Sequence, residues 1–187
     1  MEEITKAEIR NRYWTLRKNL TKNVLETYNL SINNLLKKKI PGNVHVFLPI
    51  EENFEVNIWP FIDSINHKNQ LIGTSIYNVE NNVNHVRLSQ KTTYHKGHFN
   101  IPIPKDYQKA NITQFEFILI PLMAYDNNGN RIGYGKGIYD RILKSCSNNC
   151  LKIGVSYFKP EISVPKQDHD ICLDTCITPF GEYIFNQ

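Results

Sequence analysis

The sequence predicts an α/β protein with a mostly parallel sheet covered by helices on both faces. Short apolar runs rich in β-branched and aromatic residues alternate along the chain with longer segments whose apolar residues recur every three or four positions. Strands that alternate with helices are typical of a parallel sheet. The length of 187 residues suits one α/β domain and is short for two, and the sequence contains no repeat, low-complexity tract or linker. We therefore expect residues 1–187 to form a single domain.

Two helices open the chain. Thr5 and Glu8 form a capping-box pattern, in which Thr5 is the N-cap and Glu8 reaches back to its N–H. The helix that follows carries one apolar stripe, made of Ile9, Tyr13, Leu16 and Leu20. Lys6 and Arg10 lie four residues apart, so both project from one neighbouring face of this helix. A second helix is expected from about residue 22 to residue 38.

The middle of the chain alternates extended and helical segments. The run VHVFL at 44–48 is stopped by Pro49 and predicts a buried strand. The next elements are expected to be a polar loop at 51–57, a helix bearing Trp59, Ile62 and Ile65, strands at 71–76 and 83–88, and an irregular segment at 91–107. We expect the irregular segment to lie over a site or a surface, and its histidines to be structural or exposed.

The strongest strand in the sequence is FEFILI at 115–120, which ends at Pro121 and runs into a glycine-rich segment. The remaining elements are expected to be a helix at 138–145, a strand at 151–156, a proline-containing loop to residue 174, and a closing strand near 177 and 183–185.

Composition limits the classes of function. The net charge is +4 and the pI is about 8.8, a mild excess that suits an anionic small substrate and is too scattered to indicate nucleic-acid binding. No apolar run reaches the length of a membrane span and the N-terminus lacks a signal-peptide pattern, so a cytoplasmic protein is expected. The cysteines form two pairs, Cys146 with Cys150 and Cys172 with Cys176, whose spacing fits reduced thiols better than a zinc ribbon.

The segment DNNGNRIGYGKGIYDR at 126–141 carries the chemistry. Its glycines Gly133, Gly135 and Gly137 let the backbone approach a ligand and turn N–H groups toward it. The helix expected just beyond adds a positive dipole end, Lys136 adds a cation, and Asp140 adds a possible metal ligand. This combination is typical of a phosphate-binding loop.

Two well-known phosphate motifs do not match this loop. A Walker loop requires Ser or Thr after its lysine, and Gly137 stands there. A dinucleotide fingerprint requires a third glycine where Ile138 stands. A tight turn that binds no ligand is the structural alternative, but Arg131, Lys136 and Asp140 within ten residues favour a ligand.

The segment 130–140, NRIGYGKGIYD, resembles the signature of the 5-formyltetrahydrofolate cyclo-ligase family, Arg-(Leu/Ile)-Gly-x-Gly-x-Gly-Tyr-Tyr-Asp. The resemblance extends along the chain in four further motifs. These are Lys6 with Arg10 in the first helix, Leu48 followed by an acidic loop at 51–55, the run Phe99-Asn-Ile-Pro102, and Val164-Pro165 followed by Asp170 and Asp174. Two positions depart from the signature: Tyr134 stands where the family often has Arg, and Ile138 replaces the first Tyr.

The resemblance implies a three-layer α/β/α sandwich and a reaction. In that family, ATP and a divalent ion convert 5-formyltetrahydrofolate into 5,10-methenyltetrahydrofolate, with release of ADP and phosphate. The expected small-molecule substrate is therefore a reduced folate, the expected cofactors are ATP and Mg²⁺, and the protein is expected to act as a monomer without nucleic-acid or membrane partners.

The resemblance also implies roles for individual residues. Lys136 and Arg131 would be catalytic. The nucleotide would be bound by Lys6, Arg10, Arg131, Ile132, Gly133, Tyr134, Gly135, Lys136, Gly137, Ile138 and Tyr139. The folate would be bound by Leu48, Glu55, Phe99, Tyr134, Gly135, Lys136, Gly137 and Ile138, with Glu52 or Asn53 as alternatives to Glu55. The metal ion would be held by Asp140 and Asp174.

Simpler interpretations stay open for several of these residues. Lys6 and Arg10 could form a solvated helix face, and Phe99 could be an ordinary core or lid aromatic. Asp140 could stabilise a helix terminus, and Asp174 could cap a turn. For the whole protein, the alternatives are a folate- or nucleotide-binding module without turnover, or a relative of sugar-phosphate isomerases or CoA transferases.

Overall fold

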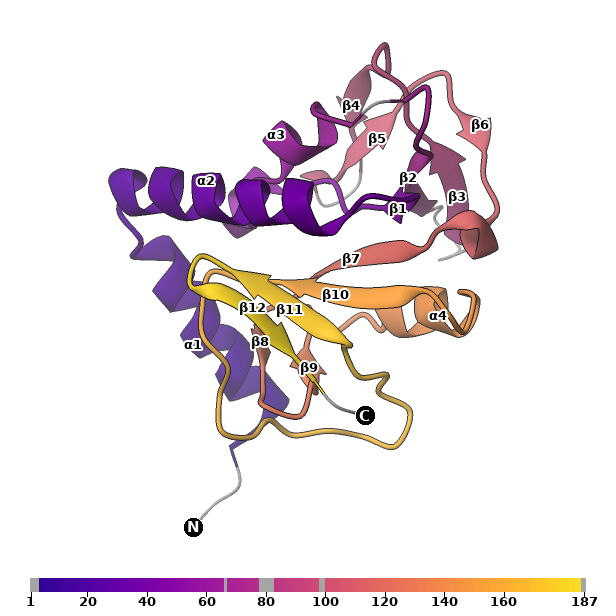
Figure 1. The fold of residues 1–187 in the computed structure, drawn as a ribbon. Helices are drawn as coiled ribbons and strands as arrows, with labels where there is room; N and C mark the ends of the chain where they lie inside the picture. The colour runs from indigo at the N-terminus through magenta and orange to yellow at the C-terminus, as the bar shows by residue number, and fades with distance from the viewer. Residues whose placement is uncertain (1–3, 66, 78–82, 98–99, 186–187) are drawn as a thin grey trace.

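The central sheet contains eight strands in the computed structural model, which describes residues 4–65, 67–77, 83–97 and 100–185 (Figure 1). In spatial order the strands are β12 (Gly181–Ile184), β11 (Thr175–Thr178), β10 (Leu151–Val155), β7 (Phe117–Pro121), β1 (Val44–His45), β2 (Ile72–Tyr77), β3 (Val83–Arg87) and β6 (Gln108–Lys109). The five strands from β11 to β2 run parallel, and antiparallel strands complete both edges. The predicted mostly parallel sheet is confirmed.

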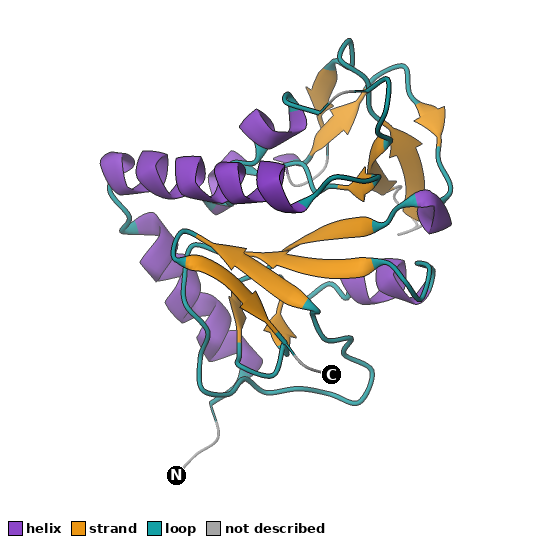
Figure 2. Ribbon diagram, viewed as in Figure 1, coloured by secondary structure: helices purple, strands orange, loops and turns teal. Residues whose placement is uncertain are grey.

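Helices cover both faces of this sheet (Figure 2). On one face α2 (Lys22–Lys39) and α3 (Trp59–Ile62) pack against side chains of the strands, and on the other face α4 (Ile138–Lys144) does so. Strand β7 shows the alternation clearly, because Leu119 belongs to the core on the α2 side while Ile118 and Ile120 belong to the core on the α4 side. This arrangement is the expected α/β/α sandwich.

Helix α1 (Lys6–Lys18) begins at the predicted capping box, with both reciprocal hydrogen bonds between Thr5 and Glu8 formed. It packs Ile9 and Tyr13 against Ala124 and Ile132 of a two-stranded ribbon, β8 (Ala124–Tyr125) and β9 (Arg131–Ile132). Because β9 leads directly into the glycine loop, this packing places the basic face of α1 beside that loop.

Several expectations about local structure were wrong. The segment 91–107 contains a hairpin of β4 (Tyr94–Lys96) and β5 (Pro102–Pro104), and the glycine-rich segment begins with the β8–β9 ribbon. The closing strand is two paired strands, β11 and β12. Strand β1 and helix α3 are shorter than expected, and short 3₁₀ helices form at Glu51–Asn53 (η1) and Ile112–Gln114 (η3). Strands of two or three residues carry too little periodicity to be predicted, since tertiary pairing decides them.

The connections create a crevice at the carboxyl ends of the parallel strands. The chain passes from β1 to β2 through α3 on one face, and from β7 to β10 through α4 on the opposite face. Strands β1 and β7 are neighbours. In open α/β sheets, ligands bind at the carboxyl ends of the strands where the connections diverge in this way. The topology therefore points to the carboxyl ends of β1 and β7.

The structure also describes the cysteines and the lengths of the helices. The four cysteines are free thiols. Among the residues that the structure describes, no helix has both the length and the apolar character needed to cross a membrane.

Candidate functional site

A cavity of about 1130 Å³ lies at the carboxyl ends of the parallel strands. Phe47 and Leu48 after β1, residues 74–77 of β2, and Pro121 at the end of β7 form its floor. Sites for single small ligands usually measure about 300–1,000 Å³. This cavity therefore has room for more than one small molecule.

The residues predicted from the sequence converge on this cavity. Those that line it are Lys6, Arg10, Leu48, Glu55, Arg131, Ile132, Gly133, Tyr134, Gly135, Lys136, Gly137, Ile138, Tyr139 and Asp140. Phe99 lies outside the described residues. Asp174 is described and lies elsewhere.

The glycine loop has a backbone shape that few other residues could adopt. Gly135 and Gly137 have φ angles of +93° and +60°, in the left-handed region, and Gly137 is the N-cap of α4. A Cβ atom on Gly135 would lie 3.2 Å from Cζ of Arg10. Arg10 in turn donates from Nε to the carbonyl of Gly133 at 2.8 Å. The absence of a side chain at Gly135 thus lets Arg10 of helix α1 approach the loop closely.

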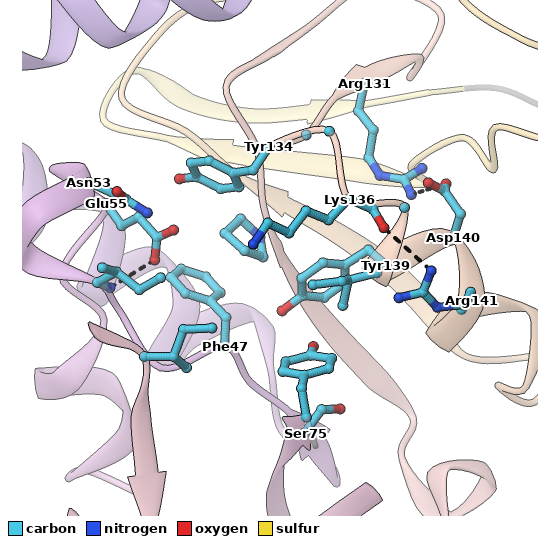
Figure 3. A pocket seen from close by; sticks show the side chains of 18 of the residues that line it. Phe47, Asn53, Glu55, Ser75, Arg131, Tyr134, Lys136, Tyr139, Asp140 and Arg141 are labelled. Atoms are coloured by element: carbon cyan, nitrogen blue, oxygen red, sulfur yellow. Dashed lines mark hydrogen bonds and ion pairs between the residues drawn. The ribbon is translucent and has the colours of Figure 1, made fainter. Parts of the chain in front are cut away.

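Cationic side chains surround the loop. Lys6 donates from Nζ to Asp170 at 2.6 Å and to Gln167 at 3.3 Å. These bonds connect the start of α1 to the strap, the segment 156–174 between β10 and β11. Arg141 donates to the carbonyl of Lys136 at 3.4 Å. Figure 3 shows the Lys136 side chain extending into the cavity, toward the side where Glu55 lies. This wall of the cavity is suited to polyanionic groups such as phosphates.

Arg131 and Asp140 form a nearly buried ion pair beside the loop. Nη2 of Arg131 lies 2.5 Å from Oδ1 of Asp140, and the Arg131 side chain is 5% exposed (Figure 3). Arg131 also donates to the carbonyl of Ile171. The pair holds the first turn of α4 against β9, and it leaves Asp140 on the cavity wall. A magnesium ion usually takes one or two carboxylates together with phosphate oxygens and water, and Asp140 fits that pattern.

Asp174 lies at the opposite ends of the parallel strands from the cavity. It immediately precedes β11, which is parallel to β10, so it stands at the amino ends of these strands. Its Oδ2 accepts from the backbone N–H of Lys152 at 2.6 Å and from the Lys152 ammonium at 2.8 Å. Within the described ranges, no group of three or more His, Cys, Asp or Glu could hold a metal ion. The aspartate that shares the cavity with Asp140 is instead Asp170.

The side of the cavity facing Lys136 is acidic and apolar. Glu55 is 8% exposed, and its carboxylate accepts from the backbone N–H of Ile50 at 2.9 Å. Burial raises the pKa of Glu55, while the Ile50 N–H, a hydrogen bond from Tyr134 and the charge of Arg17 oppose that rise. Burial likewise raises the pKa of Tyr134 and Tyr139, which face the same space. These tyrosines are therefore neutral hydrogen-bonding groups at physiological pH.

Sequence reasoning missed Arg17, although a signal was present. Lys6, Arg10 and Arg17 stand at positions i, i+4 and i+11, which fall on one face of a helix. The first two reach the cavity, and Arg17 reaches the residues behind it. Its guanidinium donates to the Tyr134 hydroxyl at 2.7 Å and to the Leu122 carbonyl at 2.6 Å.

A second missed feature is a buried hydrogen-bonded chain beneath the cavity floor. Nε2 of His45 lies 2.8 Å from Oγ of Ser75, and the same oxygen lies 3.0 Å from Nδ1 of His85. Burial, with the neighbouring His85, lowers the pKa of His45 to about 3, so His45 is neutral. Three separate strands contribute these residues. No spacing in the sequence could have indicated the contact.

Comparison with known proteins identifies relatives along the chain. The sequence model of the 5-formyltetrahydrofolate cyclo-ligase family matches residues 3–179. The chain is 40% identical over 55 residues to 5-formyltetrahydrofolate cyclo-ligase of Mycoplasma genitalium, a segment covering 29% of this chain and 33% of that protein. It is 31% identical over 64 residues to the same enzyme of Haemophilus influenzae, covering 33% of this chain and 34% of that protein. The matched segments thus span about a third of these relatives.

Solved structures extend the similarity to almost the full chain. The NMR structure of 5,10-methenyltetrahydrofolate synthetase from Aquifex aeolicus superimposes with a TM-score of 0.79 and 28% identity, covering 98% of this chain and 94% of that chain. The 5,10-methenyltetrahydrofolate synthetase from Mycoplasma pneumoniae has the same fold, with a TM-score of 0.72 and 21% identity over 94% of this chain and 99% of that chain.

Proposed function

The chain belongs to the 5-formyltetrahydrofolate cyclo-ligase family, and on this premise we propose that it uses ATP to convert 5-formyltetrahydrofolate into 5,10-methenyltetrahydrofolate. The observation that carries the proposal is the convergence of Lys6, Arg10 and Lys136 with a glycine loop on one cavity. A cavity of about 1130 Å³ with a cationic wall and an opposing acidic and aromatic wall suits a triphosphate beside a reduced folate.

The reaction is a phosphoryl transfer followed by ring closure. The formyl oxygen of the folate attacks the γ-phosphorus of ATP, and the bond from that phosphorus to the bridging oxygen breaks to release ADP. N10 of the folate then attacks the activated formyl carbon, N10 loses its proton, and the carbon–oxygen bond breaks with the oxygen leaving in inorganic phosphate. No covalent intermediate with the protein is needed, so the contribution of the protein is positioning and charge neutralisation.

The cationic residues of the cavity match that requirement. We assign the phosphates to Lys136, Arg10, Lys6 and the backbone N–H groups of the glycine loop. Arg131 supports this wall through its ion pair with Asp140 at 2.5 Å. Leu48 and Glu55 on the facing wall, together with Tyr134 of the glycine loop, would contact the folate, whose ring system is partly apolar and carries N–H donors.

A magnesium ion would be held at Asp140 together with phosphate oxygens, where it would neutralise charge on the transferring phosphoryl group. Asp140 supports this role because it lines the cavity next to the glycine loop. We do not assign Asp174 to the metal site, because its carboxylate accepts from Lys152 at the amino ends of the strands. The prediction that Asp174 binds the metal can be tested by substitution.

The decisive experiment mixes the purified protein with Mg-ATP and 5-formyltetrahydrofolate. We expect the methenyl chromophore to appear in the near ultraviolet, with one ADP and one phosphate formed per product. Omitting ATP, or supplying ADP in its place, should abolish the signal. Folded protein that yields no absorbance change with intact ATP would overturn the proposal.

The same experiment separates the cyclo-ligase from the non-catalytic alternative. A binding module would bind 5-formyltetrahydrofolate or ATP in calorimetry and produce neither methenyl product nor phosphate. A monomer confined to the cytoplasm and binding no nucleic acid remains our expectation, and light scattering after size exclusion would test the oligomeric state.

A further inference from the structure

Arg17 is a charged residue with almost no access to water. It is 2% exposed and lies near the C-terminal end of α1, two turns beyond Arg10. Its guanidinium contacts three different parts of the chain. Nη1 donates to the Tyr134 hydroxyl at 2.7 Å and to the Asn53 carbonyl at 3.3 Å, and Nη2 donates to the Leu122 carbonyl at 2.6 Å.

These contacts connect the loops that form opposite walls of the cavity. Tyr134 stands between the first two glycines of the phosphate-binding loop, and Asn53 ends the 3₁₀ helix that precedes Glu55. Leu122 follows the central strand β7. A single nitrogen of Arg17 therefore bridges the glycine loop and the acidic loop, while its neighbour is fixed to the centre of the sheet.

Burying a guanidinium is costly unless its charge and its hydrogen bonds are compensated. Nε of Arg17 is buried without a hydrogen-bond partner, and the acceptors of Nη1 and Nη2 are neutral oxygens. An apolar side chain could fill the space and would bring no unsatisfied polar atom of its own. The presence of an arginine is explained if its positive charge stabilises a negatively charged group nearby.

Glu55 is that group. It is buried on the cavity wall, and its side chain interacts with Asn53, Tyr134 and Arg17, all of which favour its charged form. Figure 3 shows the Tyr134 hydroxyl pointing toward Glu55 and Asn53. The hydroxyl accepts from Arg17, so its own proton is available to donate to the carboxylate. Arg17 therefore donates to the Tyr134 hydroxyl, and that hydroxyl donates to the Glu55 carboxylate, which accepts.

We propose that Arg17 is a positioning residue for the folate: through the Tyr134 hydroxyl and the Asn53 carbonyl, it orients the Glu55 carboxylate toward an N–H donor of the substrate. The inference rests on the proposed function for the identity of the ligand. It assigns to α1 a second role, because Lys6 and Arg10 on the same helix face serve the phosphates. One helix face thereby aligns both substrates.

The first experiment follows Glu55 itself and needs no substrate. Carboxyl carbons of glutamate are labelled with ¹³C, and the pKa of Glu55 is measured by NMR in the wild type, Arg17→Met and Tyr134→Phe. The groups facing Glu55 are Arg17 from α1, Tyr134 and Lys136 from the glycine loop, Tyr139 from α4 and Tyr157 after β10. The positive charge of Arg17 favours the ionised carboxylate, so Arg17→Met should raise the pKa of Glu55. Tyr134→Phe should also raise it, because the variant lacks the hydroxyl that donates to the carboxylate.

The second experiment separates positioning from general stability by steady-state kinetics. Arg17→Met should raise the KM for 5-formyltetrahydrofolate about tenfold or more, while the KM for ATP changes less than about twofold. Because both residues act on Glu55 in series, the double variant Arg17→Met/Tyr134→Phe should bind folate no worse than Arg17→Met alone. Additive losses, or equal losses for both substrates, would overturn the proposal.

Arg12→Met is the matched control. Arg12 lies on the same helix, but its side chain is 45% exposed and pairs with Glu161 at 2.6 Å, away from the cavity. It should leave the KM for folate and the pKa of Glu55 unchanged. If Arg17→Met does not fold, Tyr134→Phe alone decides, since it removes one hydroxyl and keeps the ring. An unchanged pKa of Glu55 in the folded variants would overturn the role of Arg17, even if the wild type is a cyclo-ligase. A wild type without activity would overturn the proposed reaction, and the titration of Glu55 would still test the role of Arg17.

Discussion

Lys136 illustrates how neighbouring glycines give one side chain its role. Gly135 and Gly137 on either side adopt positive φ angles, so the backbone turns twice within three residues. The lysine between them is carried into the cavity rather than along the helix surface (Figure 3). A lysine is a compact cation on a flexible stem, which suits a phosphate that moves during transfer.

Replacing Lys136 with alanine should lower turnover about 100- to 1,000-fold, because one preorganised charge on the transferring phosphoryl group is lost. The assay of methenyl formation measures this loss. The melting temperature should stay unchanged, since the lysine lines the cavity. Lys144→Ala, at an exposed position in the last turn of α4, is the control and should behave as wild type.

The two aspartates expected to bind the metal should respond differently. Asp140→Asn should raise the Mg²⁺ concentration that gives half-maximal rate, because Asp140 supplies a hard oxygen at the cavity. Asp174→Asn should leave that concentration unchanged, because Asp174 accepts from Lys152 at the amino ends of the strands, away from the cavity. A Mg²⁺ titration of each variant measures both. Equal shifts for the two variants would contradict the separation that the fold imposes.

At the scale of elements, the β8–β9 ribbon determines where the glycine loop begins. Asp126 at its turn is buried and accepts from the backbone N–H groups of Asn128, Asn130 and Val164. The turn continues through Gly129, whose φ is +78° and whose carbonyl accepts from Leu173 at 2.9 Å. One buried carboxylate therefore joins the ribbon to the strap that carries Asp170.

Gly129→Ala should destabilise the protein by about 1–3 kcal/mol, because an alanine is strained at this φ. In addition its Cβ would lie only 2.7 Å from the Leu173 carbonyl oxygen. Urea denaturation measures the change. Gly133→Ala is the matched control for stability, since a Cβ there meets nothing within 4 Å and its φ lies outside the left-handed region. Equal stability of the two variants would contradict this account of the turn.

At the scale of the whole molecule, the sheet buries a histidine that acid should charge. His45 is 0% exposed, and Nδ1 has no hydrogen-bond partner. A neutral imidazole carries one N–H, and an orphaned buried donor is costlier than an orphaned acceptor, so the proton belongs on Nε2 beside Ser75. His45 then donates to Ser75, and Ser75 donates to His85.

This burial predicts how stability depends on pH. The pKa of His45 is lowered to about 3 in the folded protein, whereas an unfolded histidine titrates near pH 6.5. Below about pH 6.5 the unfolded chain binds a proton that the folded protein excludes, so the contribution of His45 is complete above that pH and is lost as pH falls toward 3. From pH 6 to pH 5, the free energy of unfolding should fall by about 1 kcal/mol from this residue.

His45→Leu isolates the effect, because it removes the titrating group and keeps an apolar side chain of similar size. Urea unfolding of both proteins at pH 7.5, 6 and 5 should show a smaller loss on acidification in the variant. Equal losses would mean that other groups account for the acid sensitivity.

The sequence was sufficient to predict features that depend on residues close together along the chain. The capping box at Thr5 and the parallel strands at the apolar runs depend on residues close together, and both formed as expected, although β1 is shorter than its run. The spacing of Lys6 and Arg10 also predicted correctly that both share one face, and both line the cavity. The β4–β5 hairpin escaped prediction because strands of three residues have no periodic signal.

The sequence by itself therefore determined the fold class, the glycine loop, and the residues of that loop and of α1 that line the cavity. Only the tertiary structure decided which distant groups meet. It separated Asp174 from Asp140 because the two stand at opposite ends of parallel strands, and it brought Asp170 to the cavity instead. It also placed Arg17 behind Glu55 and joined His45, Ser75 and His85 across three strands. The physical reason is that hydrogen bonds and charges act over a few ångströms in space, whereas these residues are far apart along the chain.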